Sequence, residues 1–310
     1  MSLRRQHWLG LYLRGIAMGA ADLVPGVSGG TIALITGIYD RFIAAIASVG
    51  IDALRMVLSG KVKDAWAHVD GNFLVAVGAG VLSSVVALAS LLNWLLLNYP
   101  LPLWALFCGL ILASAIHLFY KSRIHWTRRD YALWLTGVGV ATVISLMQAT
   151  QLPVGPVSVF FAGAIAISAM LLPGISGSFL LLIMGMYQPV ISALVNVDLA
   201  TVGLFALGCL CGLLVFSRLL KALLARAQRA TMAILYGFLL GSVIMLWPWQ
   251  QPISSVIDRH GENRIVQSVP VLPQTYEELV GEPMLWLCLI AFSLGAGLVS
   301  LLLSVGSVEH

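Results

Sequence analysis

Two short motifs combine the glycines and hydroxyls that suit the binding of an anion. Residues 25–31 read PGVSGGT, and residues 173–178 read PGISGS. After each Pro-Gly break a helix can restart, with Ser28 or Ser176 as its N-cap. The first amides of such a helix lack intrahelical partners and lie at the positive end of the helix dipole. Because glycine also allows a ligand to approach the backbone closely, each motif could bind a phosphate group.

Both motifs are therefore predicted to form one anion site, although small residues also serve simply to pack membrane helices closely. The Ser-Gly pair occurs in both motifs, and this favours the anion site. The predicted phosphate-binding residues are Ser28, Gly29, Gly30, Thr31, Ser176, Gly177 and Ser178. The predicted hinges are Pro25, Gly26, Pro173 and Gly174.

Asp22 is the one acidic residue deep in the apolar sequence beside these motifs, and the equivalent position in the second copy is Met170. An acidic residue within a membrane is costly and indicates function. An ionised Asp22 would repel a phosphate, so a role in carrying a proton or in cation coupling fits its position. A structural pair with an arginine and a bond to the motif amides are the alternatives. Arg14, Arg41 and Arg218 are candidate charge partners. The plainer explanation is snorkelling to the headgroups for Arg14 and Arg218, and an interface pair with Asp40 for Arg41.

The elements that carry the motifs are themselves repeated. At one constant spacing Gly15 matches Gly163, Gly37 matches Gly185, and Tyr39 matches Tyr187. Self-similarity at a fixed period indicates one structural unit used twice. The first repeat is predicted to cover residues 1–150 and the second residues 151–310.

The composition is that of a polytopic membrane protein. The mean hydropathy is +0.97, 60% of the residues are hydrophobic, and only 10% are charged. The pI near 9.0 does not indicate nucleic-acid binding, because the placement of the basic residues is explained by membrane topology. The four cysteines lie in apolar segments and match neither a metal pattern nor a disulfide framework, so no metal or cofactor is predicted.

The predicted fold is an all-α polytopic membrane protein with an inverted-topology repeat, each half being a re-entrant helical hairpin plus three transmembrane helices. The hairpins are predicted at residues 9–48 and 158–195, because their arms are too short to cross about 30 Å of hydrocarbon. Two full spans with a proline kink are the alternative. The predicted spans are 73–97, 103–120 and 131–149 in the first half, and 200–224, 231–248 and 284–304 in the second. Residues 250–283 are predicted to be an extracytoplasmic loop.

The basic residues predict the orientation. With the N-terminus in the cytoplasm, Arg259 and Arg264 are the only two of the 17 lysines and arginines that lie outside. Three crossings in each half then place the C-terminus in the cytoplasm as well and invert the second half. An inverted repeat with broken helices that meet at the midplane is typical of secondary transporters.

Residues 14–31 (RGIAMGAADLVPGVSGGT) and 172–178 (LPGISGS) resemble the bacterial polyprenyl-phosphate transporter (PopT) family, formerly a domain family of unknown function. The resemblance covers nearly the whole chain in the order of its spans. It implies a flippase in the bacterial cytoplasmic (inner) membrane, with a polyprenyl phosphate lipid as its partner. The implied reaction is the return of undecaprenyl phosphate from the outer to the inner leaflet for recycling of the cell-wall lipid carrier. An oligomer is compatible with this plan.

Two other functions are considered. A membrane undecaprenyl-diphosphate phosphatase would need a nucleophile with an acid or base and charge stabilisation beside the serines. The motifs contain no Glu, Arg or His, and the first glutamate of the chain is Glu262, so the chain is predicted not to be an enzyme. A secondary transporter of a small soluble anion is the other alternative.

Overall fold

The computed structural model describes residues 2–23, 27–147, 152–257 and 263–306. The predicted hinge residues Pro25 and Gly26 lie outside the described residues, whereas Pro173 and Gly174 lie within them.

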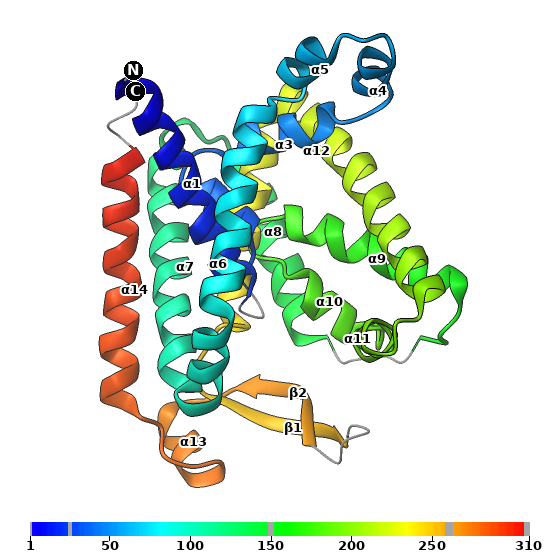
Figure 1. Cartoon of the computed structure of the whole chain (residues 1–310). Coiled ribbons are helices and arrows are strands. Elements are labelled where there is room, and N and C mark those ends of the chain that lie inside the picture. Colours follow the sequence, from blue (N-terminus) through cyan, green and yellow to red (C-terminus); the bar gives the residue numbers. More distant parts are fainter. Residues whose placement is uncertain (1, 24–26, 148–151, 258–262, 307–310) are drawn as a thin grey trace.

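The described chain is mostly helical (Figure 1). The elements before residue 150 are α1 (Ser2–Asp22), α2 (Gly29–Ile35), α3 (Tyr39–Ser48), α4 (Ile51–Leu58), α5 (Val62–His68), α6 (Gly71–Asn98), α7 (Pro100–Ser122), the 3₁₀ helix η1 (Arg123–His125) and α8 (Arg128–Leu146). The later elements are α9 (Pro156–Leu171), α10 (Gly177–Ile183), α11 (Tyr187–Val195), α12 (Leu199–Gly241), the 3₁₀ helix η2 (Ser242–Ile244), β1 (Gln250–Ile257), β2 (Asn263–Pro270), α13 (Pro273–Leu279) and α14 (Leu285–Gly306).

Three helical segments of the described chain are long and apolar enough to cross a membrane: α6, α7 and α12 together with η2. The α10–α11 pair, which is bent by 107°, would be a fourth if it is one span. Helix α9 and residues 285–299 of α14 are shorter apolar helices. The predicted spans 73–97 and 103–120 fall within α6 and α7. Span 284–304 begins one residue before α14 and otherwise lies within it, and span 131–149 overlaps α8 and extends into residues outside the described part. The chain is thus a helical membrane protein.

In the second half, the predicted spans 200–224 and 231–248 lie on either side of Ala227, where φ is −146° and ψ is 49°, so α12 consists of two helices joined at a kink between the predicted spans. Its α-helix ends at Gly241, ahead of the predicted end of the second span. The predicted loop 250–283 contains a short helix and an antiparallel hairpin, with β1 pairing from Gln250 opposite Pro270 to Ile257 opposite Asn263. Apart from this hairpin the described elements are helices, which is consistent with the predicted all-α membrane protein. In this hairpin the two polar segments satisfy their backbone groups by pairing with each other.

Helix pairs recur in the packing of the described chain. Helix α1 packs along α6 and α9 packs along α12, while α7 packs along α14 and α8 along α12. The glycines that were matched by the repeat explain part of this packing, since a methyl group on Gly15 would overlap the Val77 carbonyl of α6. A methyl group on Gly163 would likewise overlap the Phe205 carbonyl of α12. These glycines let the backbones of paired membrane helices approach closely.

The short helices α2 and α10 have the same length and lie at the repeat spacing, beginning at Gly29 and Gly177. Helices α3 and α11 begin at the matched residues Tyr39 and Tyr187. All seven residues of α2 are buried. The protein core therefore surrounds the broken segment, which is the condition for irregular backbone at membrane depth. Helices α4 and α5 instead project from one end of the bundle (Figure 1).

Candidate functional site

The two motifs lie against each other, which is the arrangement that a shared site requires. We call residues 27–31 the first tip and residues 172–178 the second tip. The Ser28 hydroxyl donates to the Met170 carbonyl at 2.8 Å, at the end of the helix that leads into the second tip. The Gly174 amide donates to Thr31 Oγ1 at 2.9 Å. These bonds join residues more than 140 positions apart in the sequence.

Tyr39 adds a third bond between the two halves, which the sequence analysis did not identify. Its hydroxyl donates to the Leu171 carbonyl at 2.9 Å, and its side chain is buried. The only sequence signal was its match with Tyr187, and that match reflects the repeat rather than a role. Tyr39 lies at the start of α3, so the turn after α2 positions it over the end of α9.

The amides of the first tip are already bonded within the protein, contrary to the prediction of bare donors. The Gly29 amide donates to Asp22 Oδ1 at 2.6 Å, and the Gly30 amide donates to Ser28 Oγ at 3.1 Å. The Thr31 amide donates to the Ser28 carbonyl at 2.9 Å. The physical reason is that this tip is buried, and a buried amide without an acceptor is costly.

Asp22 therefore adopts the third of the roles considered for it, the bond to a motif amide. Its carboxylate lies over Gly29, where an added methyl group would be 2.6 Å from Oδ2. Met170 occupies the equivalent position over Gly177, where an added methyl group would be 2.7 Å from the Met170 side chain. The two tips thus share one backbone plan, but the first has an acidic side chain where the second has an apolar one.

The second tip has the less heavily bonded polar groups. Ser176 is the N-cap residue of α10 by position, but its hydroxyl lies 3.0 Å from the Ser178 hydroxyl and does not bond an amide. Ser176 is buried and Ser178 half-buried. The described residues supply no hydrogen-bond acceptor to the amides of Gly177 and Ser178. This tip therefore offers hydroxyl and amide donors in one place.

The arginines proposed as charge partners are bonded into the surrounding fold. Arg41 pairs with Asp70 at 2.6 Å and lies 4.4 Å from the centre of the Phe73 ring. Arg218 donates to the Val49 carbonyl at 2.9 Å. Arg14 is half-buried on α1. The contacts of Arg41 and Arg218 hold α3 against α6 and α12, which gives each of them a structural role.

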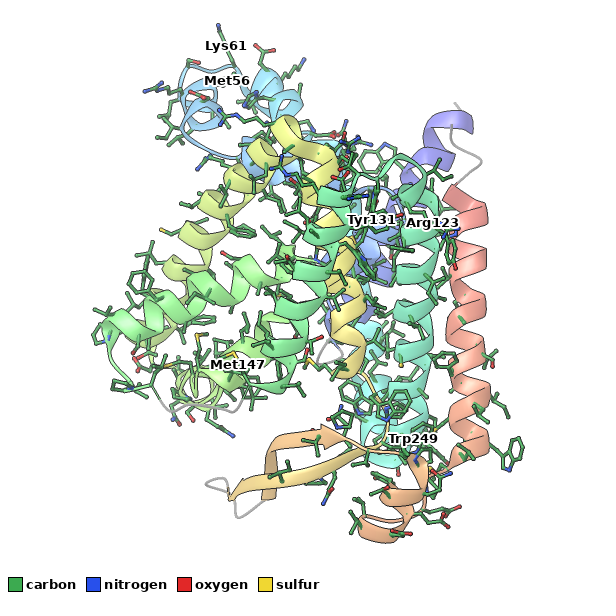
Figure 2. All side chains as sticks on the ribbon, turned by 180° about the vertical axis from the view of Figure 1, so that it is seen from behind. Met56, Lys61, Arg123, Tyr131, Met147 and Trp249 are labelled. Carbon is green, nitrogen blue, oxygen red and sulfur yellow. The ribbon has the colours of Figure 1, made fainter. Side chains whose placement is uncertain are left out.

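The kink of α12 is held by polar contacts at the end of the molecule where Arg41 and Arg218 lie. Gln228 donates to Asp40 at 3.0 Å, and Arg229 pairs with Asp130 at 3.2 Å. Arg123 and Tyr131, which bracket the start of α8, lie near this end, opposite to Trp249 (Figure 2). In the orientation predicted from the basic residues, this is the cytoplasmic end.

A cavity of about 410 Å³ lies beside the second tip, toward the end that carries the β-hairpin. Its walls include Phe179 and Leu182 of α10, Met147 after α8, and Gln250 and Tyr276. Figure 2 shows Met147 on the side of α10 and α11, and Trp249 at the base of the hairpin. The mixed polar and apolar lining suits an amphipathic ligand.

The chemistry available at the tips is hydrogen-bond donation to an anion. The polar side chains are the hydroxyls of Ser28, Thr31, Ser176 and Ser178, with the Asp22 carboxylate at one edge. No group of three or more His, Cys, Asp or Glu side chains that could bind a metal occurs among the described residues.

Comparison with known proteins finds close relatives of the chain. A family model described as undecaprenyl phosphate translocase-like matches residues 18–264. A protein of Vibrio cholerae named polyprenyl-phosphate transporter is 39% identical over 297 residues, which cover 96% of each chain. A Staphylococcus aureus protein of the same name is 35% identical over 263 residues, covering 79% of this chain and 88% of that one. No solved structure matches the chain.

Proposed function

Since this chain belongs to the undecaprenyl phosphate translocase-like family, we propose that it is a flippase that returns undecaprenyl phosphate from the outer to the inner leaflet of the bacterial cytoplasmic membrane. The lipid would then be available again as the carrier of cell-wall precursors. The observation that carries this proposal is the direct bonding of the two tips to each other inside a bundle of membrane helices.

The recurrence of helices supports a plan of two inverted halves. Helices α2 and α10 have the same length, and α3 and α11 begin at the matched tyrosines Tyr39 and Tyr187. Helix α1 packs along α6 as α9 packs along α12. These correspondences fit one unit used twice. We propose that α1–α3 and α9–α11 are re-entrant hairpins, with both termini in the cytoplasm. Alternating access would then exchange the exposure of the two tips about a fixed central site.

The phosphate group would be bound by exchanging bonds between the tips for bonds to the lipid. Ser28 and Thr31 now bond to backbone groups of the other half, and they would turn to phosphate oxygens as the tips separate. Ser176, Gly177 and Ser178 would donate from the second tip, and Gly29 and Gly30 from the first. Donors from both halves would make the bound headgroup part of the contact between them.

Asp22 supplies a route for coupling transport to protons or another cation. In the present arrangement its carboxylate accepts from the Gly29 amide, which is one of the proposed phosphate donors. A phosphate and an ionised carboxylate would compete for this amide and repel each other. Protonation of Asp22 weakens it as an acceptor and would release the amide to the phosphate, so proton uptake and headgroup binding would favour each other.

The test is translocation of labelled undecaprenyl phosphate by the purified chain in proteoliposomes, with and without a pH gradient. The wild-type chain is expected to move the lipid. A Ser176→Ala/Ser178→Ala variant is expected to lose at least nine-tenths of the rate, because it lacks both hydroxyls of the second tip. Ser293→Ala is the matched control, since the exposed Ser293 hydroxyl bonds to the Leu289 carbonyl of its own helix at 2.8 Å.

The two alternative functions give different results in the same vesicles. Release of inorganic phosphate from undecaprenyl diphosphate would support the phosphatase and overturn the proposal. Uptake of water-soluble phosphate without movement of the lipid would support the small-anion transporter and would overturn it as well.

A further inference from the structure

A second cavity, of about 550 Å³, lies between α8, α9, α10 and α12. Of these helices, α9, α10 and the first part of α12 form one side of the bundle (Figure 1). We call it the lateral groove. Its lining residues are Ile144, Phe160, Ala164, Ile165, Ser168, Ala169, Leu172, Ile175, Leu180, Cys211, Gly212, Val215 and Phe216. Its volume is within the range of about 300–1,000 Å³ found for ligand cavities.

The lining of the lateral groove offers almost nothing that could bind a polar group. Its one hydroxyl, that of Ser168, donates to the Ala164 carbonyl of α9 at 2.7 Å and lies 3.5 Å from the Gly212 carbonyl of α12, so it is already bonded within the protein. A polar ligand placed there would lose its hydrogen bonds to water without replacement, at a cost of several kcal/mol. The groove therefore suits hydrocarbon.

The groove is open toward the membrane at its edge. Val215 of α12 has 67% of its surface exposed and Ile165 of α9 has 44%, although both line the groove. Helix α9 carries no charged residue, and neither does α12 before Arg218, so the exposed edge faces lipid in a membrane. A chain lying in the groove could thus continue into the bilayer.

The inner end of the groove is continuous with the second tip. Leu172, Ile175 and Leu180 contribute to its wall, and the first two belong to the tip itself. The hydroxyls of Ser176 and Ser178 follow directly in the chain. A ligand with a phosphate at the tip would therefore have this apolar surface beside its first carbon atoms.

We propose that the lateral groove binds the phosphate-proximal isoprene units of the polyprenyl chain. This inference rests on the proposed function and deepens it by assigning a separate site to the lipid tail. Lipid hydrocarbon is about as apolar as the groove, so transfer of the chain from the bilayer gives little hydrophobic gain. The role of the groove is instead to fix the direction of the tail, so that the phosphate arrives at the tips in one orientation, and the remaining isoprene units stay in the bilayer.

The experiment uses undecaprenyl phosphate that carries a photoreactive diazirine in an isoprene unit next to the phosphate. In the wild-type chain, reconstituted in nanodiscs, the label is expected on peptides of α9 and α12 that line the groove. Excess unlabelled undecaprenyl phosphate should abolish this labelling, whereas the same amount of phosphatidylglycerol should leave it unchanged. Equal competition by phosphatidylglycerol would mean a groove for ordinary acyl chains and would overturn the proposal, as would labelling confined to other helices.

A pair of variants tests the same site without a photoreactive lipid. Val215→Trp adds a ring at the exposed edge of the groove, and Leu210→Trp adds the same ring on the same helix at a residue that is 52% exposed and does not line the groove. Val215→Trp is expected to lower translocation of undecaprenyl phosphate at least tenfold, and Leu210→Trp less than twofold. Thermal unfolding of both variants shows whether they fold, and the photolabelling of the wild-type chain decides the question if Val215→Trp does not.

The outcomes separate this inference from the proposed function. If the wild-type chain moves no undecaprenyl phosphate, the proposed function fails. If the wild-type chain is active and Val215→Trp folds and transports at the wild-type rate, the tail site alone fails. If Val215→Trp instead dissociates an oligomer in the membrane, the groove is a contact between copies of the chain and the proposal is wrong.

Discussion

The bond between Thr31 and Gly174 gives the sharpest prediction about how the two tips are held together. Thr31 is fully buried, and its Oγ1 accepts from the Gly174 amide at 2.9 Å. Thr31→Val keeps the shape of the side chain but removes the acceptor, so a buried amide is left without a partner. Such a loss costs about 1–3 kcal/mol. Since 1.4 kcal/mol corresponds to a factor of ten, the contact between the tips is expected to open about 5- to 150-fold more often.

Hydrogen exchange measured by mass spectrometry on the peptide that contains residues 172–178 detects this opening, because exchange of a bonded amide follows local opening. Exchange of the Gly174 amide should accelerate in Thr31→Val and remain at the wild-type rate in Thr31→Ser, which keeps the oxygen. Thr36→Val is the matched control, since the buried Thr36 hydroxyl donates to the Ile32 carbonyl of its own helix at 2.7 Å. Equal exchange in Thr31→Val and the wild type would refute the reasoning, and so would an equal acceleration in Thr36→Val.

Three further predictions concern single residues. Gly174 has φ of +80°, and an added methyl group would lie 2.6 Å from a backbone oxygen, so Gly174→Ala should lower the free energy of unfolding by at least about 1–2 kcal/mol. Gly139→Ala is the control, because a methyl group added at Gly139 would have no neighbouring atom within 4 Å. Thermal unfolding measures both variants. Asp22→Asn keeps an oxygen for the Gly29 amide, so it should fold like the wild type but lose the response of transport to a pH gradient. Asp22→Met removes this acceptor and should be destabilised by about 1–3 kcal/mol. An undiminished pH response in Asp22→Asn would contradict the coupling role. Bonds from the Thr127 amide and hydroxyl hold the pKa of Asp130, at the start of α8, below its ordinary value of about 3.9. The ionised Asp130 carboxylate therefore stabilises the fold fully above pH 3.9, and this stabilisation is lost as the pH falls through the lowered pKa. Asp130→Asn should have a lower Tm than the wild type at pH 7 and the same Tm at a pH below the lowered pKa.

The sequence predicted the parts of the site that follow from composition and repetition. Apolar segments interrupted by two similar motifs indicated broken membrane helices, and the structure has helices that restart at Ser28 and Ser176, with the two tips in contact. The predicted spans 73–97 and 103–120 each lie within one long helix, because long uninterrupted apolar runs have few other conformations in a membrane.

The polar contacts of the site depend on how distant segments of the chain fold against each other, and local sequence patterns do not reveal this. Asp22 and Gly29 are seven residues apart, and that spacing alone does not predict the bond between the carboxylate and the amide. The bonds from Tyr39 to Leu171 and from Ser28 to Met170 join the two halves, so neither could be inferred from local spacing. Local reasoning about helix starts therefore overestimated the free donors of the first tip.

The β-hairpin was missed for a different reason. Residues 250–283 were interpreted by their polarity alone, although two extended segments can satisfy their backbone groups by pairing with each other. The basic residues Arg226 and Arg229 lie between the predicted spans 200–224 and 231–248, and α12 is kinked beside them, at Ala227.

The central claim is that one phosphate headgroup is bound by both tips at once. It is tested most directly with undecaprenyl phosphate that carries a photoreactive group at the phosphate, followed by mapping of the labelled peptides in the reconstituted chain. The account predicts label on the peptide around residues 27–36 and on the peptide around residues 170–180, with both lost when unlabelled lipid is added in excess. Label on only one of these peptides, or only on segments remote from them such as the β-hairpin, would contradict it.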